Sequence, residues 1–288
     1  MASASRTPAG PAPAPAPAAA AVRRRRRPRL DRERALAVIA PLVLLALLLG
    51  TWQAGVWNDL LGVKPFTLPA PSAIWEAFGE SGDELRDNTL VTLLPAMLGY
   101  AIGNGLGVLA GMALTSLPRP TAARLSAALI AVQATPLVAL APLVSLYIGA
   151  GTAFKATIVA IMCFPSMVVW SQAGFTSVET SALEYMDSME ATRRQVFRKL
   201  RFPAAVPYMF TALQYTTVLA LIGAIVCETL KGRNGLGYLM IEQLAGFDAP
   251  LAWAALVTLS AIGIAWYAAI GVLEALVAPW KTARRPSR

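Results

Sequence analysis

Residues 205–230 read AVPYMFTALQYTTVLALIGAIVCETL, and a single member of this run, Glu228, carries a charge. A helix needs roughly 20 predominantly apolar residues to cross the hydrocarbon core of a bilayer. Similar runs recur along the chain, and of its 288 residues 56% are hydrophobic and 14% are charged. Soluble domains carry about 25% charged residues, so most of this chain is expected to face lipid. We therefore predict an all-α membrane protein.

The apolar runs divide into six predicted transmembrane helices. Turn-forming residues separate the second from the third at 117–120 (LPRP) and the third from the fourth at 149–151 (GAG). The six predicted spans are approximately 36–57, 89–115, 122–148, 153–175, 205–230 and 250–277.

The distribution of Lys and Arg predicts how these spans are oriented. Cytoplasmic loops carry an excess of Lys and Arg. With both termini in the cytoplasm, the inside segments hold 20 of the 25 basic residues, and five lie outside. We therefore predict a cytoplasmic N-terminus and C-terminus. The inside segments are 1–35, 116–121 with its flank, 176–204 and 278–288; the five outside residues are Lys64, Arg86, Lys155, Lys231 and Arg233.

The two ends of the chain differ in composition from the rest. Residues 1–34 combine an Ala-Pro repeat with an arginine run at 23–27, and this composition predicts a disordered cytoplasmic tail. The arginines lie next to the first apolar run, where they can bind anionic lipid headgroups. Residues 281–288 form a second basic cytoplasmic tail, which leaves 35–280 as one transmembrane domain.

Several classes of function are not expected from this composition. The net charge is +9, but the basic residues lie in tails and loops rather than on one face of a soluble fold, so no nucleic-acid partner is expected. Histidine is absent, and the two cysteines, Cys163 and Cys227, lie within apolar runs. Neither a metal site nor a catalytic site is therefore expected in this chain.

Four glycines recur at intervals of four residues in the second predicted span, which puts them on one face of a helix. A face without side chains lets a neighbouring backbone approach closely. We predict that this face forms a tight helix contact, within a bundle or in a dimer, rather than a ligand site. The four residues are Gly99, Gly103, Gly107 and Gly111.

Polar side chains within the predicted spans are candidates for a transport path. For the Gln, Thr and Tyr members of this group, hydrogen bonding between helices explains them at least as well. Glu228 is predicted to lie near the outer interface, where water solvates it, as a gate or a docking residue. The middle of the spans contains no cationic side chain that would mark a strong anion site. The candidates are Gln133, Thr135, Gln172, Gln214, Tyr215 and Glu228.

The segment between the fourth and fifth predicted spans is too long for a simple turn. Residues 181–203 read SALEYMDSMEATRRQVFRKLRFP, in which Leu183, Met186 and Met189 follow helical spacing. The segment is therefore predicted to be an amphipathic helix. An exposed helix with an apolar face needs a partner, either the membrane surface or a protein groove.

This segment resembles the EAA loop of ABC-transporter permease subunits, whose pattern is Glu-Ala-Ala, three residues, Gly, nine residues and Ile-x-Leu-Pro. Glu184 and Pro203 match the pattern, while Leu200 and Phe202 replace its Ile and Leu. Residues 185–186 (YM) replace the alanine pair. The spacing therefore fits the loop from its first position to its last.

One departure from the EAA pattern affects the expected backbone, because Glu190 occupies the position of the glycine. Glycine there would permit a positive φ, which is costly for glutamate. We therefore predict that this loop is more continuously helical than is usual in the family.

The resemblance extends over roughly residues 35–280. Residues 68–72 (LPAPS), the stretch from 136 to 142 and residues 235–239 (GLGYL) look like nitrate/sulfonate/taurine-type importer permeases. It implies a type I ABC importer permease in the cell inner membrane, in which the loop is a coupling helix seated on a separate ATPase subunit. The implied coupling residues are Glu184, Met186, Asp187, Met189, Glu190, Ala191, Thr192, Arg193, Phe197 and Pro203.

The resemblance also implies a set of partners. ATP and Mg²⁺ would bind the ATPase, because this chain has no Gly-x-x-x-x-Gly-Lys-Ser/Thr loop of its own. A second, identical permease subunit would complete the channel, and an external binding protein would deliver a small solute. That solute would be a sulfonate-, taurine- or nitrate-like anion, or a pyrimidine or riboflavin-type vitamin precursor. An ATP-independent secondary transporter or channel is the alternative, although no internal repeat supports it.

Overall fold

A computed structural model describes residues 29–64, 66–133 and 137–280, and every regular element in these ranges is a helix. The two predicted tails lie almost wholly outside the described residues, as does Thr135. The chain divides into two units, Met1–Gly50 and Thr51–Arg288. In the first unit the described element is α1 (Arg29–Gln53), whose part from Ile39 onward is apolar.

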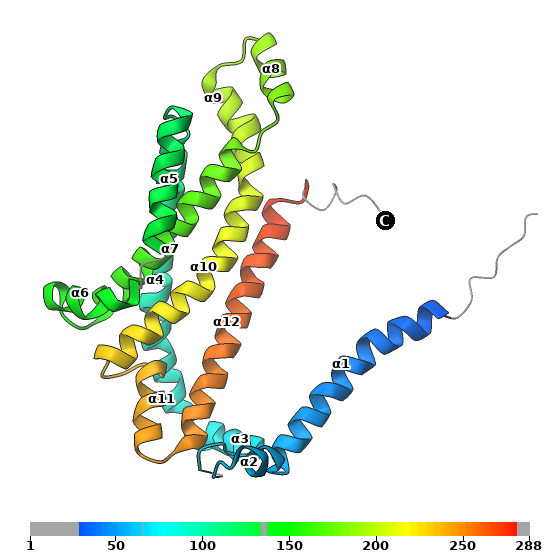
Figure 1. The fold of residues 1–288 in the computed structure, drawn as a ribbon, viewed down its shortest axis with the longest axis vertical. Coiled ribbons are helices and arrows are strands. Elements are labelled where there is room, and N and C mark those ends of the chain that lie inside the picture. Colours follow the sequence, from blue (N-terminus) through cyan, green and yellow to red (C-terminus); the bar gives the residue numbers. More distant parts are fainter. Residues whose placement is uncertain (1–28, 65, 134–136, 281–288) are drawn as a thin grey trace, which may run out of the picture. The chain divides into compact units, whose positions relative to one another are not determined.

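The second unit contains the long apolar helices (Figure 1). Three of them are α4 (Gly82–Leu114), α7 (Thr152–Thr176) and α12 (Ala249–Val277). The fourth is a continuous stretch that ends in α10 (Phe202–Lys231). All four are long enough and apolar enough to cross a membrane. They correspond to the second, fourth, fifth and sixth predicted spans.

The third predicted span is divided into separate helices. α5 (Arg119–Gln133) is followed, beyond the undescribed residues 134–136, by a 3₁₀ turn at Leu137–Leu140 and then by α6 (Ala141–Ile148). Pro142 lies in the first turn of α6, where its missing amide hydrogen is tolerated. A helix continued through that position would lose a hydrogen bond and clash with the proline ring.

Short helices lie before and between the long ones. Gly55, with φ 75°, separates α1 from α2 (Val56–Leu61). The remaining short helices, with their bounds, are α3 (Pro71–Glu80), α8 (Thr180–Ser188), α9 (Arg193–Val196) and α11 (Leu236–Ala245).

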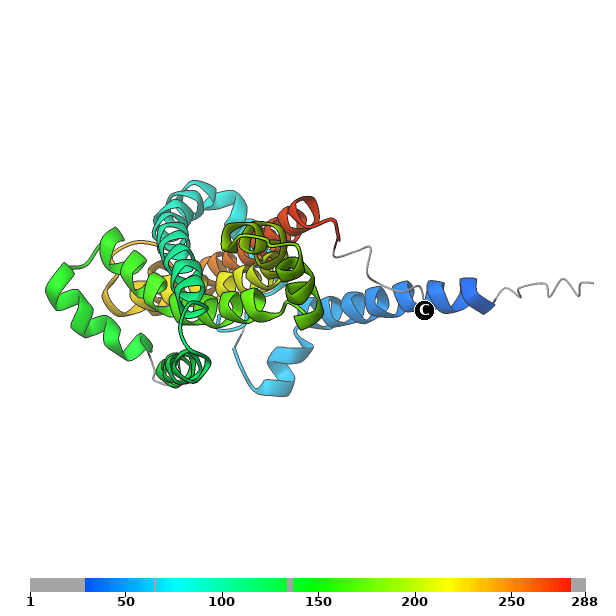
Figure 2. The ribbon, with the colours of Figure 1, turned by 90° about the horizontal axis from the view of Figure 1, so that it is seen from above.

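The core of the second unit forms where α4, α7 and α10 pack against one another, with α12 against α10 (Figure 1, Figure 2). The four glycines of α4 are buried and face α7. A Cβ atom on Gly103 would lie 2.6 Å from the carbonyl oxygen of Ala160, and one on Gly107 would lie 2.6 Å from Cβ of Met167. Gly105, on another face of α4, has nothing within 4 Å. The glycine face of α4 is therefore filled by a helix of the same chain.

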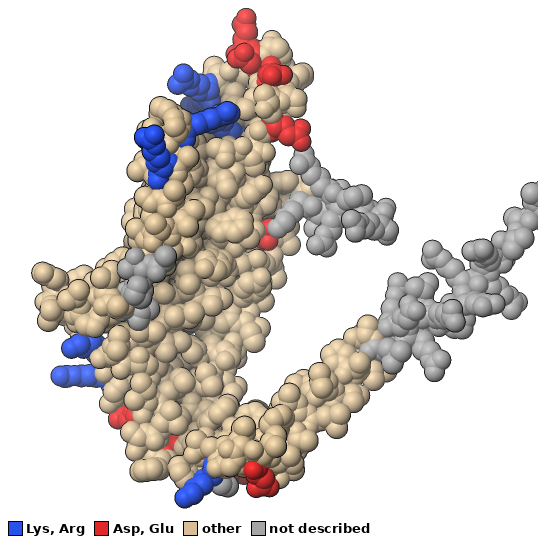
Figure 3. Space-filling model, in the orientation of Figure 1, with Lys and Arg blue, Asp and Glu red and all other residues tan. Residues whose placement is uncertain are grey.

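Basic side chains concentrate at one end of the helices. Lys and Arg gather at the end of the second unit that carries α5 and α9, on the face seen in Figure 3. By the positive-inside rule this is the cytoplasmic end, and α3 and α11 lie toward the outer end.

Candidate functional sites at the two ends of the helices

The segment between α7 and α10 is two short helices joined by a turn. α8 ends at Ser188, and Glu190 has a φ of 51°. The prediction that Glu190 would make this loop more continuously helical than usual is therefore wrong. The amide of Glu190 donates to the carbonyl of Asp187 (2.9 Å), and the amide of Ala191 donates to the carbonyl of Met186 (3.0 Å). This pair of bonds is a Schellman motif, and it offsets the roughly 1–2 kcal/mol that a left-handed residue costs.

A capping box starts α9, which begins at Arg193 and is separated from the end of α8 by four residues. The hydroxyl of Thr192 accepts from the amide of Gln195 (3.4 Å), and the amide of Thr192 donates to the side-chain oxygen of Gln195 (2.8 Å). Two of the amides at the start of the helix, those of Thr192 and Gln195, therefore have a side-chain partner. The turn between α8 and α9 is thus defined by hydrogen bonds on both sides.

The surface of α8 is open, because none of its residues is buried. Tyr185 is 64% exposed and Met189 is 62% exposed. Among the residues predicted to couple, the exposed ones are Glu184, Asp187, Met189, Glu190, Thr192 and Arg193, and the half-buried ones are Met186, Ala191, Phe197 and Pro203.

An aromatic contact anchors this segment to the long helices. The ring of Phe197 stacks on Phe175, near the end of α7, with ring centroids 5.6 Å apart. It also lies 6.2 Å from the ring of Phe202, the first residue of α10. Residues Phe197–Arg201 form a π-helical turn, a distortion that is frequent at functional sites. A displacement of α8 and α9 would therefore reach both α7 and α10.

A buried ion pair joins α7 to α10 near the opposite end. Nζ of Lys155 lies 2.7 Å from Oε1 of Glu228, and the side chains are 6% and 0% exposed. Oε2 of Glu228 accepts from the hydroxyl of Thr92 (3.0 Å) and from the amide of Gly237 (2.9 Å). The carboxylate thus has three donors, as a buried charge requires.

The turn between α10 and α11 fits around this carboxylate. Gly235 has a φ of 108°, and a Cβ atom there would lie 2.6 Å from Oε2 of Glu228. The amide of Gly235 donates to the side-chain oxygen of Asn88 (2.7 Å), and the amide of Leu236 donates to the hydroxyl of Thr92 (2.8 Å). One polar cluster therefore ties α4, α7, α10 and the start of α11 together.

These positions correct one sequence interpretation and extend another. Glu228 was expected near the outer interface in contact with water, but its side chain is fully buried. Lys155, counted among the outside basic residues, lies near the start of α7 and is the partner of Glu228. The sequence contains a signal for this pair. Each of the two is a charged residue within an apolar run, and both lie near the same predicted membrane surface.

The other candidates for a transport path have separate surroundings. Gln133 is exposed at the end of α5, while Gln172 accepts a hydrogen bond from Ser126 and so links α7 to α5. Gln214 is half-buried on α10, and Tyr215 beside it is exposed. The structure therefore does not gather these residues at one point.

A polar contact that the sequence reading missed lies within the bundle. The hydroxyl of Thr216 on α10 donates to the side-chain oxygen of Asn104 on α4 (3.0 Å), and both residues are buried. The hydroxyl of Tyr100 donates to the carbonyl of Leu213 (3.0 Å). Asn104 follows Gly103 directly in the sequence, so its place beside the glycine face was the available signal.

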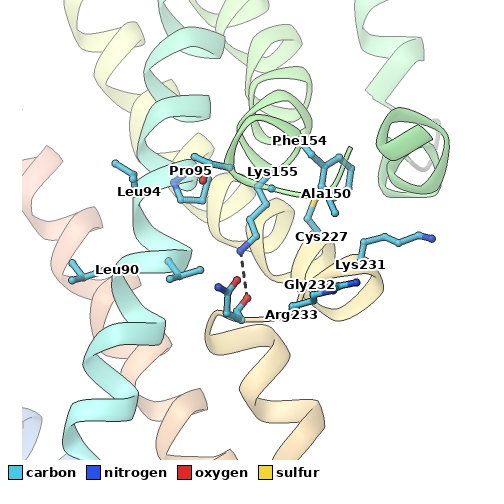
Figure 4. A pocket seen from close by; sticks show the side chains of 14 residues that line it. Leu90, Leu94, Pro95, Ala150, Phe154, Lys155, Cys227, Lys231, Gly232 and Arg233 are labelled. Carbon is cyan, nitrogen blue, oxygen red and sulfur yellow. Dashed lines mark hydrogen bonds between the residues drawn. The ribbon is translucent and has the colours of Figure 1, made fainter. Parts of the chain in front are cut away.

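A cavity of about 700 Å³ lies beside the ion pair. Its lining comes from α4, from the residues around the start of α7 and from the turn after α10 (Figure 4). Lys155, Lys231 and Arg233 are its cationic residues.

Comparisons with known proteins agree with this architecture. Residues 103–279 match the family described as binding-protein-dependent transport system inner membrane component. The riboflavin transport system permease protein RibX of Chloroflexus aurantiacus is 34% identical over 83% of this chain and 89% of its own length. The formylaminopyrimidine transport permease protein ThiX of Halalkalibacterium halodurans is 30% identical over 86% of this chain and 98% of its own length.

A more distant relative and a solved structure show the same pattern. The putative aliphatic sulfonates transport permease protein SsuC of Bacillus subtilis is 25% identical over 83% of this chain and 87% of its own length. Among solved structures, a chain of the inward-facing MetNI methionine ABC transporter has a TM-score of 0.57 at 20% identity. The match covers 66% of this chain and 94% of that one, and it supports the fold.

Proposed function

Because the chain belongs to the binding-protein-dependent transport system inner membrane component family, and is thus an ABC importer permease subunit, we propose that α8 and α9 couple it to a separate ATPase. The observation that carries this proposal is the open surface of α8. Tyr185, on a helix with no buried residue, and Met189, its C-cap residue, are large apolar side chains that are left exposed. Such a face gains free energy when a protein groove covers it.

The proposed partners complete the transporter. ATP and Mg²⁺ bind the ATPase subunit, and this chain contributes no catalytic site. An external binding protein delivers the solute, which is a sulfonate-like anion or a pyrimidine or riboflavin-type precursor, as in the names of the relatives. A second copy of this chain encloses the path. The exposed apolar side chains of α6 support that contact, since Leu146 is 78% and Tyr147 is 90% exposed.

The contacts suggest how motion passes through the permease. Closure of the ATPase dimer displaces the docked helices α8 and α9. Phe197 transmits the displacement to Phe175 on α7 and Phe202 on α10. Since these helices also pack on α4, they tilt as a group, and the path opens to one side or the other.

The test is a charge reversal on the exposed face of α8. Glu184→Lys is expected to weaken association with the ATPase by about 30-fold or more, as for a central interface residue. Membrane insertion and folded yield stay unchanged, because Glu184 is exposed. The measurement is co-purification of the ATPase with the tagged permease, together with solute uptake.

Glu80→Lys is the matched control, since it makes the same chemical change on an exposed residue of α3 at the other end. It is expected to leave ATPase association intact. Normal co-purification of the Glu184→Lys variant would contradict the coupling role of α8.

A further inference from the structure

The cavity beside the ion pair has one apolar wall and one basic wall. Leu90, Leu94 and Pro95 of α4 form part of its lining, and Lys231 and Arg233 contribute from the end of α10 and the turn after it (Figure 4). Its volume of about 700 Å³ falls within the 300–1,000 Å³ typical of small-molecule sites.

The charges around this cavity are unbalanced. Its lining contains three cations and, among the described residues, no acidic side chain. The charge of Lys155 is offset by Glu228, at 2.7 Å. Lys231 and Arg233 are exposed, and the ion pairs found within the described ranges do not involve them. Two positive charges are therefore available to a ligand.

We propose that this cavity binds a small amphipathic anion. Its sulfonate, carboxylate or phosphate group contacts Lys231 and Arg233, and its apolar body lies against Leu90 and Leu94. Guanidinium and ammonium groups are the side chains that make charge-assisted hydrogen bonds to such oxygens. The identification of the anion as the transported solute rests on the proposed function.

The three cations differ in burial and in pairing, and this difference makes the site testable. Lys155 is buried and paired, so its removal would disturb the fold. Lys231 and Arg233 are exposed, so their neutralisation changes the charge of the cavity and leaves the packing of the helices intact. A loss of binding in variants of these two residues would therefore report recognition rather than unfolding.

The experiment compares two probes of matched shape, hexanesulfonate and the uncharged hexanesulfonamide. Each is titrated without ATP into the permease–ATPase complex in phosphatidylcholine nanodiscs. Hexanesulfonate is expected to bind about tenfold more tightly than hexanesulfonamide, in keeping with a hydrogen bond to a charged group. The double variant Lys231→Gln/Arg233→Gln is expected to remove that difference. Equal binding of the two probes, or unchanged binding by the double variant, would overturn the proposal.

The matched control is Lys64→Gln/Arg86→Gln, which removes two exposed outer cations that do not line the cavity. It is expected to bind hexanesulfonate as the wild type does. Co-purification of the ATPase is scored on every sample. Lost binding in a complex that retains the ATPase thus isolates the cavity, and failure of the wild-type permease to retain the ATPase would count against the coupling proposal alone.

A second arm distinguishes a solute from a lipid headgroup. Nanodiscs containing phosphatidylglycerol offer an anion with the same chemistry. In one outcome, phosphatidylglycerol prevents hexanesulfonate from binding, and mass spectrometry finds this lipid retained by the wild type and not by the double variant. The anion site then stands, and its occupant is a lipid. If hexanesulfonate binds equally well in both membranes, the occupant is a soluble anion.

Discussion

The two ends of the helical bundle meet opposite physical requirements. At the outer end, Glu228 is fully buried and receives hydrogen bonds from Lys155, Thr92 and the amide of Gly237, all within the same chain. At the cytoplasmic end, α8 has no buried residue and exposes Tyr185. At the outer end, residues of the same chain satisfy the buried carboxylate. At the cytoplasmic end, α8 presents an exposed surface that a partner protein can cover.

The two ends differ in how their contacts fix the positions of the helices. A buried ion pair adds little net stability, because desolvation of the two charges offsets most of their attraction. The outer cluster fixes the positions of the helices, since α4, α7 and α11 each donate a hydrogen bond to the one carboxylate that α10 carries. The cytoplasmic segment is held by local bonds, namely a Schellman motif at Glu190 and a capping box at Thr192. Such a segment keeps its own shape and can still move with a partner.

The largest effect is expected from Glu228→Ala, which leaves the buried charge of Lys155 without its counter-ion. Breaking a buried pair in this way typically costs about 3–5 kcal/mol. The backbone amide of Gly237 also loses its acceptor. Thermal denaturation of the detergent-solubilised protein, followed by size-exclusion chromatography, should show a large loss of stability.

The double variant Lys155→Met/Glu228→Gln separates charge from position. It removes both charges while Gln keeps an oxygen for the hydroxyl of Thr92 and the amide of Gly237. Its stability is expected to recover most of the loss caused by Glu228→Ala. If the double variant were as unstable as Glu228→Ala, the ion pair would not be the source of the effect.

Hydropathy predicted the long helices well, because the preference of an apolar run for lipid depends on composition alone. The four longest apolar helices therefore lie where the sequence placed them. The third predicted span differs, since its apolar residues are divided between α5 and α6. Hydropathy contains no term for the helix-breaking effect of Pro142 within an apolar run.

The candidate sites depended on contacts that a single sequence does not contain. Lys155 and Glu228 are 73 residues apart, and their pairing requires the register of α7 on α10. Glu190 shows a different limit of prediction from sequence. Glutamate does disfavour a positive φ, as predicted, but other interactions at this position outweigh that preference. The two hydrogen bonds of the Schellman motif were the competing contribution.

A smaller loss of stability is expected from Gly107→Leu on the face of α4 that contacts α7. A side chain there would overlap Met167, and overpacking of this kind costs about 1–3 kcal/mol. Gly105→Leu is the matched control, because the same helix has open space at that position. Thermal denaturation should therefore separate the two leucine variants. Equal stability would show that α4 and α7 are not in close contact.

The smallest effect is expected at the turn between α8 and α9, where Glu190→Gly should stabilise the local structure. A left-handed glutamate costs about 1–2 kcal/mol, while glycine loses roughly 0.5–1 kcal/mol more in backbone entropy. The net gain is then about 0.5–1 kcal/mol, which corresponds to roughly two- to fivefold slower hydrogen exchange at the amides of Glu190 and Ala191. Glu190→Ala removes the carboxylate and keeps a Cβ atom, so it should exchange as the wild type does. If the alanine and glycine variants were slowed equally, charge repulsion rather than backbone strain would be the cost at this turn.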